Sequence, residues 1–286
     1  MVNRFIIIII LLKVIPVLAQ NQGYDSLALE RNRVYQSIEA ALKNPDMVYK
    51  LDLSFKSLGT FPKEILQFKN LEFLQMNFNA IPEIPDEISQ LKNLKYVDFR
   101  QLLIKELPVG FYELENLEIL TLNGCEIEYL SDSVKNLKSL KELMIGSNKL
   151  KSLPNSIAKL QNLEKLDIYN NEFPTFPEVI CEIKSLKRLN VMNNNFKTLS
   201  PCLVKLNNLR DLDISYNEFQ EMPKVVYQLN QLEKLSISGL QIEYIPEEIK
   251  NFKNLNTLYL KKTPLASDKE KIEELKRLLP NTNLKY

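Results

Sequence analysis

The sequence predicts an α/β solenoid, in which short parallel strands and short helical turns alternate along one uninterrupted array. The main observation is a unit that recurs every 23 residues from Val48 and reads LxxLxLxxNxLxxLPxxIxxLxN. Nine full copies occupy residues 48–254 without insertion or deletion, and a tenth begins at Leu255 and breaks after Leu265. Apolar residues alternate in the first half of each copy, and a proline usually opens the second half. A fixed period of this length is the signature of a repeat architecture.

The first half of the unit predicts a strand. Apolar residues at every second position are the pattern of a strand with one buried face. In the fifth copy, Leu143 and Ile145 are therefore expected to point inward, while Glu142, Met144 and Gly146 point outward. A strand this short cannot bury its own apolar face, but a stack of neighbouring copies can.

The second half of the unit predicts a turn onto the opposite, convex side. Proline has no N–H and cannot sit in a central ladder, so the chain is leaving the sheet where it occurs. The apolar pair that follows, such as Ile157 and Leu160, has the i,i+3 spacing of a short helical turn. The prolines at this position are Pro62, Pro85, Pro108, Pro154, Pro177, Pro223 and Pro246.

Units such as "LKELMIGSNKLKSLPNSIAKLQN" and "LRDLDISYNEFQEMPKVVYQLNQ" resemble the leucine-rich-repeat family in its 23-residue LPxxI form, and in particular its secreted bacterial members. The resemblance covers residues 48–265. It implies a curved horseshoe with a parallel β-sheet on the concave face and short helical or 3-10 segments and loops on the convex face. It also implies that the concave face binds a protein.

The same resemblance implies that the Asn at position nine of the unit is buried and bonded to the backbone of neighbouring loops, as a buried amide must be. These residues are Asn79, Asn148, Asn171, Asn194 and Asn217. Leu102 and Leu240 occupy this position in two other copies and cannot make the bonds of an amide. We expect water or an altered loop backbone in those two coils.

The segments that flank the array predict a leader and two covers. Residues 1–19 read as a secretory signal peptide, with Arg4 before an apolar run and small residues at the predicted cleavage site. Residues 20–47 are expected to form an N-terminal helical cap. Residues 266–286 are expected to form a C-terminal capping helix and tail, with Ser267 and Glu270 as a capping box.

The signal peptide predicts export to a periplasmic, cell-surface or extracellular location. No later segment is long and apolar enough for membrane insertion after cleavage. The absence of Asn-x-Ser/Thr sequons favours a bacterial over a eukaryotic exported protein. If residues 1–19 are not a signal, the alternative is an intracellular scaffold.

The amino-acid composition excludes several kinds of catalytic and binding site. The 286 residues contain no His, which excludes His-dependent catalytic triads and His-ligated zinc. The six Gly are isolated, so no phosphate-cradling loop is expected. The net charge of +1, or +1 − 2 = −1 without Arg4 and Lys13, gives little attraction for nucleic acid. We therefore expect no enzyme, no cofactor and no nucleic-acid partner.

Two further sets of residues could carry chemistry but are expected to be structural. Position five holds four aspartates in non-adjacent copies, which we expect to be solvated rather than to bind metal; they are Asp52, Asp98, Asp167 and Asp213. Cys125 fills a position-nine slot and is expected to be buried. Cys181 and Cys202 fall on the convex side of adjacent copies, where packed helical segments about 8–10 Å apart make a disulfide geometrically marginal.

The predicted concave face carries exposed apolar residues in its first half. Phe73, Tyr96 and Ile119 are consecutive outward residues at position three, and Met144 extends them. Contiguous apolar residues of this kind often mark an interaction site. A second group consists of Tyr169, Met192 and Tyr216, and Arg100 belongs to the same predicted binding surface.

Two position-eight aromatics have two interpretations. Phe55 and Phe78 either flank the apolar residues on the surface or, as we favour, tuck into the coil edge as core. In the second half of the position-three column, Glu142 beside Lys165 and Arg188 beside Asp211 predict solubilising cross-strand pairs.

These features predict a secreted, non-enzymatic recognition protein that binds a protein partner through its concave face. The alternative is carbohydrate or cell-wall glycan binding, although Trp, the best stacking residue for sugars, is absent. We expect a monomer, or weak self-association through the same apolar surface.

Overall fold

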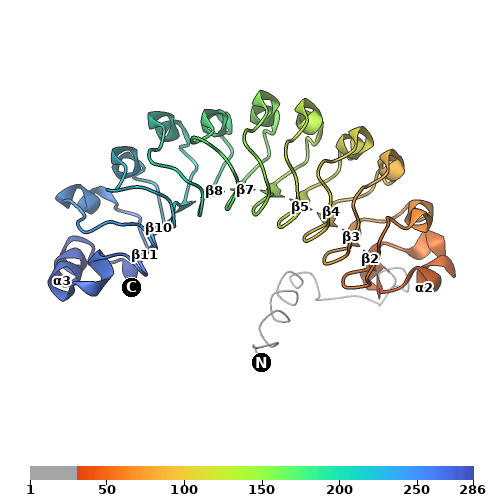
Figure 1. Cartoon of the computed structure of the whole chain (residues 1–286), viewed down its shortest axis with the longest axis horizontal. Coiled ribbons are helices and arrows are strands. Elements are labelled where there is room, and N and C mark those ends of the chain that lie inside the picture. The colour runs from red at the N-terminus through yellow and green to blue at the C-terminus, as the bar shows by residue number, and fades with distance from the viewer. Residues whose placement is uncertain (1–30) are drawn as a thin grey trace, which may run out of the picture.

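A computed structural model describes residues 31–286, which form one curved solenoid with its strands along the inner side of the arc (Figure 1). Within these residues twelve strands form a single parallel sheet in chain order. The leader predicted at residues 1–19 lies outside the described residues. The strands are β1 Val34–Tyr35, β2 Lys50–Asp52, β3 Phe73–Gln75, β4 Tyr96–Asp98, β5 Ile119–Thr121, β6 Glu142–Met144, β7 Lys165–Asp167, β8 Arg188–Asn190, β9 Asp211–Asp213, β10 Lys234–Ser236, β11 Thr257–Tyr259 and β12 Asn283–Lys285.

The 23-residue period sets the register of the repeat strands, because each residue pairs with the one 23 positions later; Leu143, for example, pairs with Leu166. The inward leucines are almost completely buried, and so is Ile145. Glu142 and Met144 stay half-buried on the concave face, as predicted. Gly146 is the exception, since the ring of Tyr169 covers it.

The convex side consists of short 3-10 segments, and most of them begin directly after the predicted proline. The fold class predicted from the sequence is therefore confirmed. The segments are η1 Pro45–Met47, η2 Lys63–Gln67, η3 Asp86–Gln90, η4 Val109–Glu113, η5 Asp132–Asn136, η6 Asn155–Lys159, η7 Glu178–Glu182, η8 Pro201–Lys205, η9 Lys224–Gln228, η10 Glu247–Asn251 and η11 Leu265–Ser267.

Each end of the array carries a helix and an additional strand. At the N-terminal end, helix α2 (Ile38–Leu42) is capped by the Ser37 hydroxyl, and β1 pairs with β2. At the C-terminal end, helix α3 (Lys269–Leu278) leads into β12. These two edge strands were not anticipated from the sequence. Within residues 31–286, no helix is long and apolar enough to cross a membrane.

The predicted N-cap of α3 is wrong by one residue. Ser267 belongs to the preceding 3-10 segment, so it is not available as a cap. Asp268 is extended instead, and its carboxylate accepts the backbone N–H groups of Glu270 and Lys271 at 3.0 and 3.2 Å. The apolar face of the helix is buried against the last coil through Ile272 and Leu275.

The position-nine amides form a hydrogen-bonded ladder inside the loops. In four consecutive coils each Nδ2 donates to a carbonyl of the preceding coil at 2.9–3.2 Å. Each Oδ1 accepts a backbone N–H from that coil at 3.0–3.1 Å. The ladder therefore satisfies buried loop backbone across coil boundaries. Its members are Asn148, Asn171, Asn194 and Asn217, and Asn79 makes the equivalent bonds near the N-terminal end.

The expected loop distortion at Leu102 and Leu240 does not occur. The residue before each leucine has a positive φ, 56° at Gln101 and 70° at Gly239. Position eight has a positive φ in all the remaining repeats as well, from Phe55 to Lys262. Both leucines are buried instead. In the coil between Leu102 and the ladder, the Cys125 thiol takes the place of an amide and donates to the Phe99 carbonyl at 3.1 Å.

The last position of the unit carries a second amide ladder, which was not anticipated from the sequence. Each of these Asn side chains donates from Nδ2 to the carbonyl of the residue 24 positions earlier at 2.8–3.2 Å. This second ladder joins neighbouring coils at their convex ends, and the position-nine ladder joins the same coils at their loops. The residues are Asn70, Asn93, Asn116, Asn162, Asn208 and Asn254.

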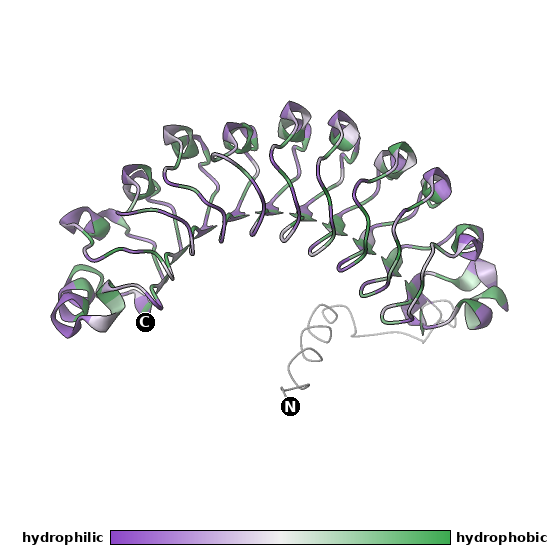
Figure 2. Ribbon diagram, in the orientation of Figure 1, coloured by the Kyte–Doolittle hydropathy of each residue, from purple (hydrophilic) through white to green (hydrophobic). Residues whose placement is uncertain are grey.

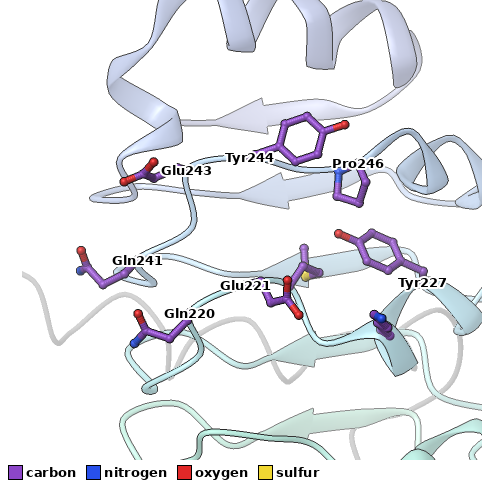
Figure 3. A pocket seen from close by; sticks show the side chains of 9 residues that line it. Gln220, Glu221, Tyr227, Gln241, Glu243, Tyr244 and Pro246 are labelled. Atoms are coloured by element: carbon purple, nitrogen blue, oxygen red, sulfur yellow. The ribbon is translucent and has the colours of Figure 1, made fainter.

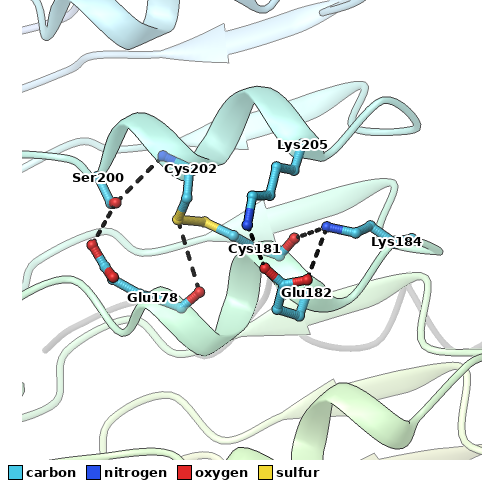
Figure 4. Close-up of a disulfide and its surroundings, with 7 residues drawn as sticks. All are labelled: Glu178, Cys181, Glu182, Lys184, Ser200, Cys202 and Lys205. Carbon is cyan, nitrogen blue, oxygen red and sulfur yellow. Dashed lines mark hydrogen bonds and ion pairs between the residues drawn. A yellow bond between two sulfur atoms is a disulfide. The ribbon is translucent and has the colours of Figure 1, made fainter.

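Cys181 in η7 and Cys202 in η8 form a disulfide across two neighbouring coils (Figure 4). Their Cα atoms are 5.7 Å apart, closer than the 8–10 Å expected for packed helices. The expectation of marginal geometry is wrong because the 3-10 segments belong to coils whose strands stack at about 4.8 Å. Beside the disulfide, Lys205 pairs with Glu182 at 2.7 Å.

Candidate functional site

The first half of the concave face carries a contiguous set of half-buried apolar side chains, here called the concave patch: Phe73, Tyr96, Ile119 and Met144. Strands β3 to β5 hold the first three in register, since Phe73 pairs with Tyr96 and Tyr96 with Ile119. Met144 on β6 lies diagonally from Ile119, because it pairs with Thr121. The rings of Phe73 and Tyr96 stack with centroids 4.0 Å apart and an angle of 8° between their planes. Stacking of this kind adds about 0.5–1.5 kcal/mol to burial.

A buried charge lies beneath this patch. Asp98, on β4, has no exposed surface, and its carboxylate accepts Nε and Nη2 of Arg100 at 2.9 and 2.6 Å. It also accepts Nδ2 of Asn77 from the preceding coil at 2.8 Å. The prediction of a solvated Asp98 is therefore wrong, because the two position-seven side chains close over it. Asp52, Asp167 and Asp213 are only partly buried.

The Asp98–Arg100 pair shapes the electrostatics of the patch. Hydrogen bonding to Asp98 raises the pKa of the Arg100 guanidinium, so Arg100 stays charged. Its side chain remains 41% exposed beside Tyr96. Burial, and secondarily the charge of Asp98, raises the pKa of the Tyr96 hydroxyl to about 12. The patch therefore presents a fixed cation and a neutral phenol among apolar side chains.

The floor around the pair holds further polar groups. Gln75, Asn77 and Thr121 are each at least nine-tenths buried. Within the described part of the chain, Asn77 Oδ1 and Thr121 Oγ1 have no hydrogen-bond partner. Buried polar atoms without partners are costly. Both residues adjoin Asp98, because Thr121 pairs with it in the register of the sheet and Asn77 donates to its carboxylate from Nδ2.

The position-eight aromatics are on the surface. Phe55 and Phe78 are 65% and 41% exposed, and their rings stack with centroids 4.5 Å apart. The favoured interpretation, in which they tuck into the core, is wrong. Their positive φ of 58° and 56° explains this, because it turns the side chain outward from the coil. Bulky residues adopt this conformation at a cost of about 1–2 kcal/mol.

The second predicted group does not lie in one row. The Tyr169 ring covers Gly146 of the preceding coil, whereas the Tyr216 ring covers Gly239 of the following coil. The two tyrosines thus lean in opposite directions along the solenoid, with half-buried Met192 between them in the sequence. The Lys262 Nζ lies 5.8 Å from the centroid of the Tyr216 ring.

The second half of the concave face is hydrophilic, as the colouring of strands β7 to β10 shows (Figure 2). Glu142 pairs with Lys165 at 3.2 Å and Arg188 with Asp211 at 3.0 Å, the two cross-strand pairs that the sequence predicts. A hollow of about 430 Å³ lies over this half. It is lined in part by Asp167 and Asp213, and burial raises the pKa of both carboxyls.

A second charged column, at position two, was not anticipated from the sequence, and four pairs of opposite charges join neighbouring coils there at the start of the strands. The pairs are Glu72–Lys95 at 3.0 Å, Glu118–Lys141 at 2.6 Å, Glu164–Lys187 at 2.7 Å and Arg210–Glu233 at 3.8 Å. Exposed pairs contribute little stability. Within residues 31–286, no group of three His, Cys, Asp or Glu side chains could hold a metal ion.

Comparison with known proteins identifies the repeat. A family model described as a leucine-rich repeat region matches residues 86–200 and 128–236, which together cover more than half of the 286 residues. None of the curated proteins matches the sequence significantly.

Solved structures have the same fold. The leucine-rich-repeat ectodomain of the plant membrane receptor kinase GASSHO1/SCHENGEN3 from Arabidopsis thaliana, in complex with CASPARIAN STRIP INTEGRITY FACTOR 2, is 25% identical with a TM-score of 0.59 over 83% of this chain. A TDR receptor is 23% identical with a TM-score of 0.68 over 88%. An internalin from Listeria monocytogenes is 19% identical with a TM-score of 0.55 over 79%. The chain spans 28%, 49% and 76% of these three chains, respectively.

Proposed function

The chain belongs to the leucine-rich-repeat family, and on that basis we propose that it is an exported, non-enzymatic recognition protein that binds a protein partner through the concave patch. The observation that carries the proposal is the stacked pair of Phe73 and Tyr96 on the open face of the sheet. Aromatic side chains, Met and Arg are favoured anchors of protein interfaces. The patch contains the aromatic residues and Met144, and Arg100 is held beside it by Asp98.

Two exposed aromatic residues outside the patch also support a binding role. Phe55 and Phe78 are 65% and 41% exposed, and their rings stack with centroids 4.5 Å apart. Exposed apolar groups that lie together often mark an interaction site. The Arabidopsis ectodomain, whose fold this chain shares, is in complex with CASPARIAN STRIP INTEGRITY FACTOR 2, which is consistent with a binding role for the same fold here.

The alternative of a glycan ligand is less well supported by the ring geometry. A sugar stacks on the open face of an aromatic ring. In the Phe73–Tyr96 pair the planes are nearly parallel at 4.0 Å, so each ring covers one face of the other. The outer faces of the pair lie toward Lys50 and Ile119, their neighbours in the register of the sheet. The stack therefore offers mainly ring edges to a ligand, and apolar protein side chains pack well against such edges.

Export is the part of the proposal that depends on the leader at residues 1–19. Arg4, the apolar run and the small residues Val17 and Ala19 support it. Sequencing the N-terminus of the protein purified from its source checks this point, since a chain that retains residue 1 or 2 would fit an intracellular scaffold instead.

The binding proposal is tested with one pair of variants. Phe73→Ala with Tyr96→Ala is expected to abolish capture of a protein ligand from cell-surface extract while leaving the thermal unfolding transition cooperative. The matched control is Lys234→Ala with Thr257→Ala, which changes two paired residues at the same unit position in the hydrophilic half. Equal capture by both double variants would reject the concave patch, and binding confined to a glycan array would reject a protein ligand.

A further inference from the structure

One constellation of side chains occurs twice along the lateral surface of the solenoid. In the third and fourth repeats it consists of Glu106, Tyr112, Tyr129 and Ser131. The Tyr129 hydroxyl bonds to the Glu106 carboxylate. The backbone N–H of Ser131 donates to the Tyr112 hydroxyl at 3.3 Å. Both phenols therefore have partners, and the constellation is closed.

The equivalent residues of the eighth and ninth repeats are Glu221, Tyr227, Tyr244 and Pro246. Proline replaces serine at the last position and has no N–H to donate. As a result the Tyr227 hydroxyl is buried without a hydrogen-bond partner among residues 31–286. In the region that the structure describes, no hydrogen bond joins the Tyr244 hydroxyl to the Glu221 carboxylate, and Tyr244 is 57% exposed.

Where the first constellation is closed, the second surrounds a hollow of about 490 Å³ (Figure 3). In the close-up the Tyr227 side chain extends toward Pro246, with Glu221 and Tyr244 on either side of the opening. The volume falls within the range of small-ligand sites, about 300–1,000 Å³. Met222 and Glu243 also line the hollow, together with the exposed Lys224.

The surroundings of the hollow are acidic and aromatic. Two acidic residues, Glu221 and Glu243, line the hollow, and Lys224 is the single basic residue among its lining residues. Burial, followed by the negative charges of Glu248 and Glu221, raises the pKa of the Tyr227 hydroxyl, which places that hydroxyl in a negative field. Tyrosine faces attract cations as well. A hydroxyl that has no hydrogen-bond partner and lies near negative charges is suited to accept a hydrogen bond from a cationic donor.

We propose that the hollow between the eighth and ninth repeats is a second binding site, which takes a guanidinium group. A guanidinium is planar and carries five N–H donors, so it can stack on Tyr244 while donating to Glu221 and to the Tyr227 oxygen. The Tyr227 hydroxyl is buried in the wall of the hollow, so the bond to it requires the lining side chains to shift when the donor enters. The site is separate from the concave patch and does not depend on it.

The test uses n-butylguanidinium as the probe and the full chain labelled with ¹³C at its methionine methyl groups. Met222 is buried in the wall of the hollow, so its methyl resonance reports occupancy. We expect a saturable shift of that resonance with n-butylguanidinium and none with n-butanol or butyrate. A capped Gly-Arg-Gly peptide distinguishes the source: tighter binding of the peptide indicates an arginine of a protein partner, and weaker binding indicates a small organic cation.

Variants of the two constellations sharpen the test. Glu221→Gln is expected to weaken binding about tenfold, and Tyr227→Phe about fivefold. Pro246→Ser restores the N–H that the closed constellation has, and is expected to give the same fivefold loss because the hydroxyl is then occupied. The backbone accepts it, since φ is −71° at Pro246 and −66° at Ser131. Tyr112→Phe, in the closed constellation, is the control and leaves affinity unchanged.

The proposal is overturned if the Met222 methyl shows no saturable shift with n-butylguanidinium, or if Glu221→Gln binds as tightly as the unmodified chain. Glu221 is exposed, so this variant keeps the test valid if a change at Tyr227 or Pro246 disturbs folding. Because the readout is local to the eighth and ninth repeats, it does not respond to failure of the concave patch.

Discussion

The Nη2 of Arg100 lies 2.6 Å from Oδ2 of Asp98, a carboxylate with no exposed surface, beneath the aromatic stack of the concave face. The two residues are two positions apart on one coil, so both point to the concave side. Asp98 also accepts the backbone N–H of Arg100 at 3.1 Å. Its carboxylate thus fixes the cation that the concave patch presents to a partner.

The Asp98–Arg100 pair predicts an asymmetric effect of removing either partner. Arg100→Ala leaves the buried Asp98 carboxylate without its cationic partner and is expected to lower the free energy of unfolding by about 3 kcal/mol. This is the lower end of the range for broken buried pairs, because Arg100 is partly exposed. Asp98→Asn leaves a guanidinium that can reach water, so the loss is expected to be smaller, about 1–2 kcal/mol. Urea denaturation measures both. Arg188→Ala, which breaks the exposed pair with Asp211, is the control at less than about 1 kcal/mol; an equal loss there would contradict the prediction.

Cys125 predicts a loss of stability at alkaline pH. Burial raises the pKa of its thiol from 9.0 to about 12 in the folded chain. Above pH 9 the unfolded chain releases this proton and the folded chain keeps it, so the stabilisation is complete below pH 9 and declines as the pH rises toward 12. At pH 10 the expected loss is about 1.4 kcal/mol. Urea denaturation at pH 8 and pH 10 measures it. Cys125→Ser should lower the difference by about 1.4 kcal/mol, and the remainder comes from groups such as Tyr96 and Tyr227, whose pKa burial also raises. An unchanged difference would refute the assignment.

The disulfide predicts a defined thiol count and a defined contribution to stability. The chain denatured without reductant should expose one reactive thiol, that of Cys125, and three after reduction. Cys181→Ala with Cys202→Ala opens a link between residues 21 positions apart and is expected to cost about 3 kcal/mol of unfolding free energy. Glu182→Gln, which removes the neighbouring ion pair with Lys205, should cost under about 1 kcal/mol. Three thiols before reduction would exclude the bond.

The periodic features of the fold could be predicted, and the contacts between coils could not. Alternating leucines determine which face of each strand is buried, so the register of the sheet follows from the 23-residue period. The burial of Asp98 depends on Asn77, which is distant in the sequence and meets it only when the coils stack. The disulfide distance likewise depends on coil spacing. The helix cap moved to Asp268 because a 3-10 segment took up Ser267, which no local pattern indicated.

For the candidate site, the pattern identified which side chains face outward but not how they are arranged. Phe73 and Tyr96 are adjacent in the position-three column, and the structure stacks them. The exposure of Phe55 and Phe78 follows from the positive φ that position eight adopts in all ten repeats, a conformation that aromatic residues rarely adopt. Side-chain direction after a strand ends cannot be derived from alternation.

The position of Tyr169 predicts an effect of a change one coil away. A Cβ added at Gly146 would lie 2.1 Å from Cδ1 of the Tyr169 ring, whereas one added at Gly59 meets no atom within 4 Å. Gly146 lacks the positive φ that would strain an alanine, and the ring belongs to a half-buried surface side chain that can move. Gly146→Ala should therefore displace the ring with little loss of stability. If Tyr169 belongs to the binding surface, as the sequence predicts, affinity for a captured protein ligand falls several-fold, while Gly59→Ala has no effect. Unchanged affinity in both Gly146→Ala and Tyr169→Ala would confine the binding surface to the concave patch, because a displaced or deleted ring cannot be part of a contact that survives it.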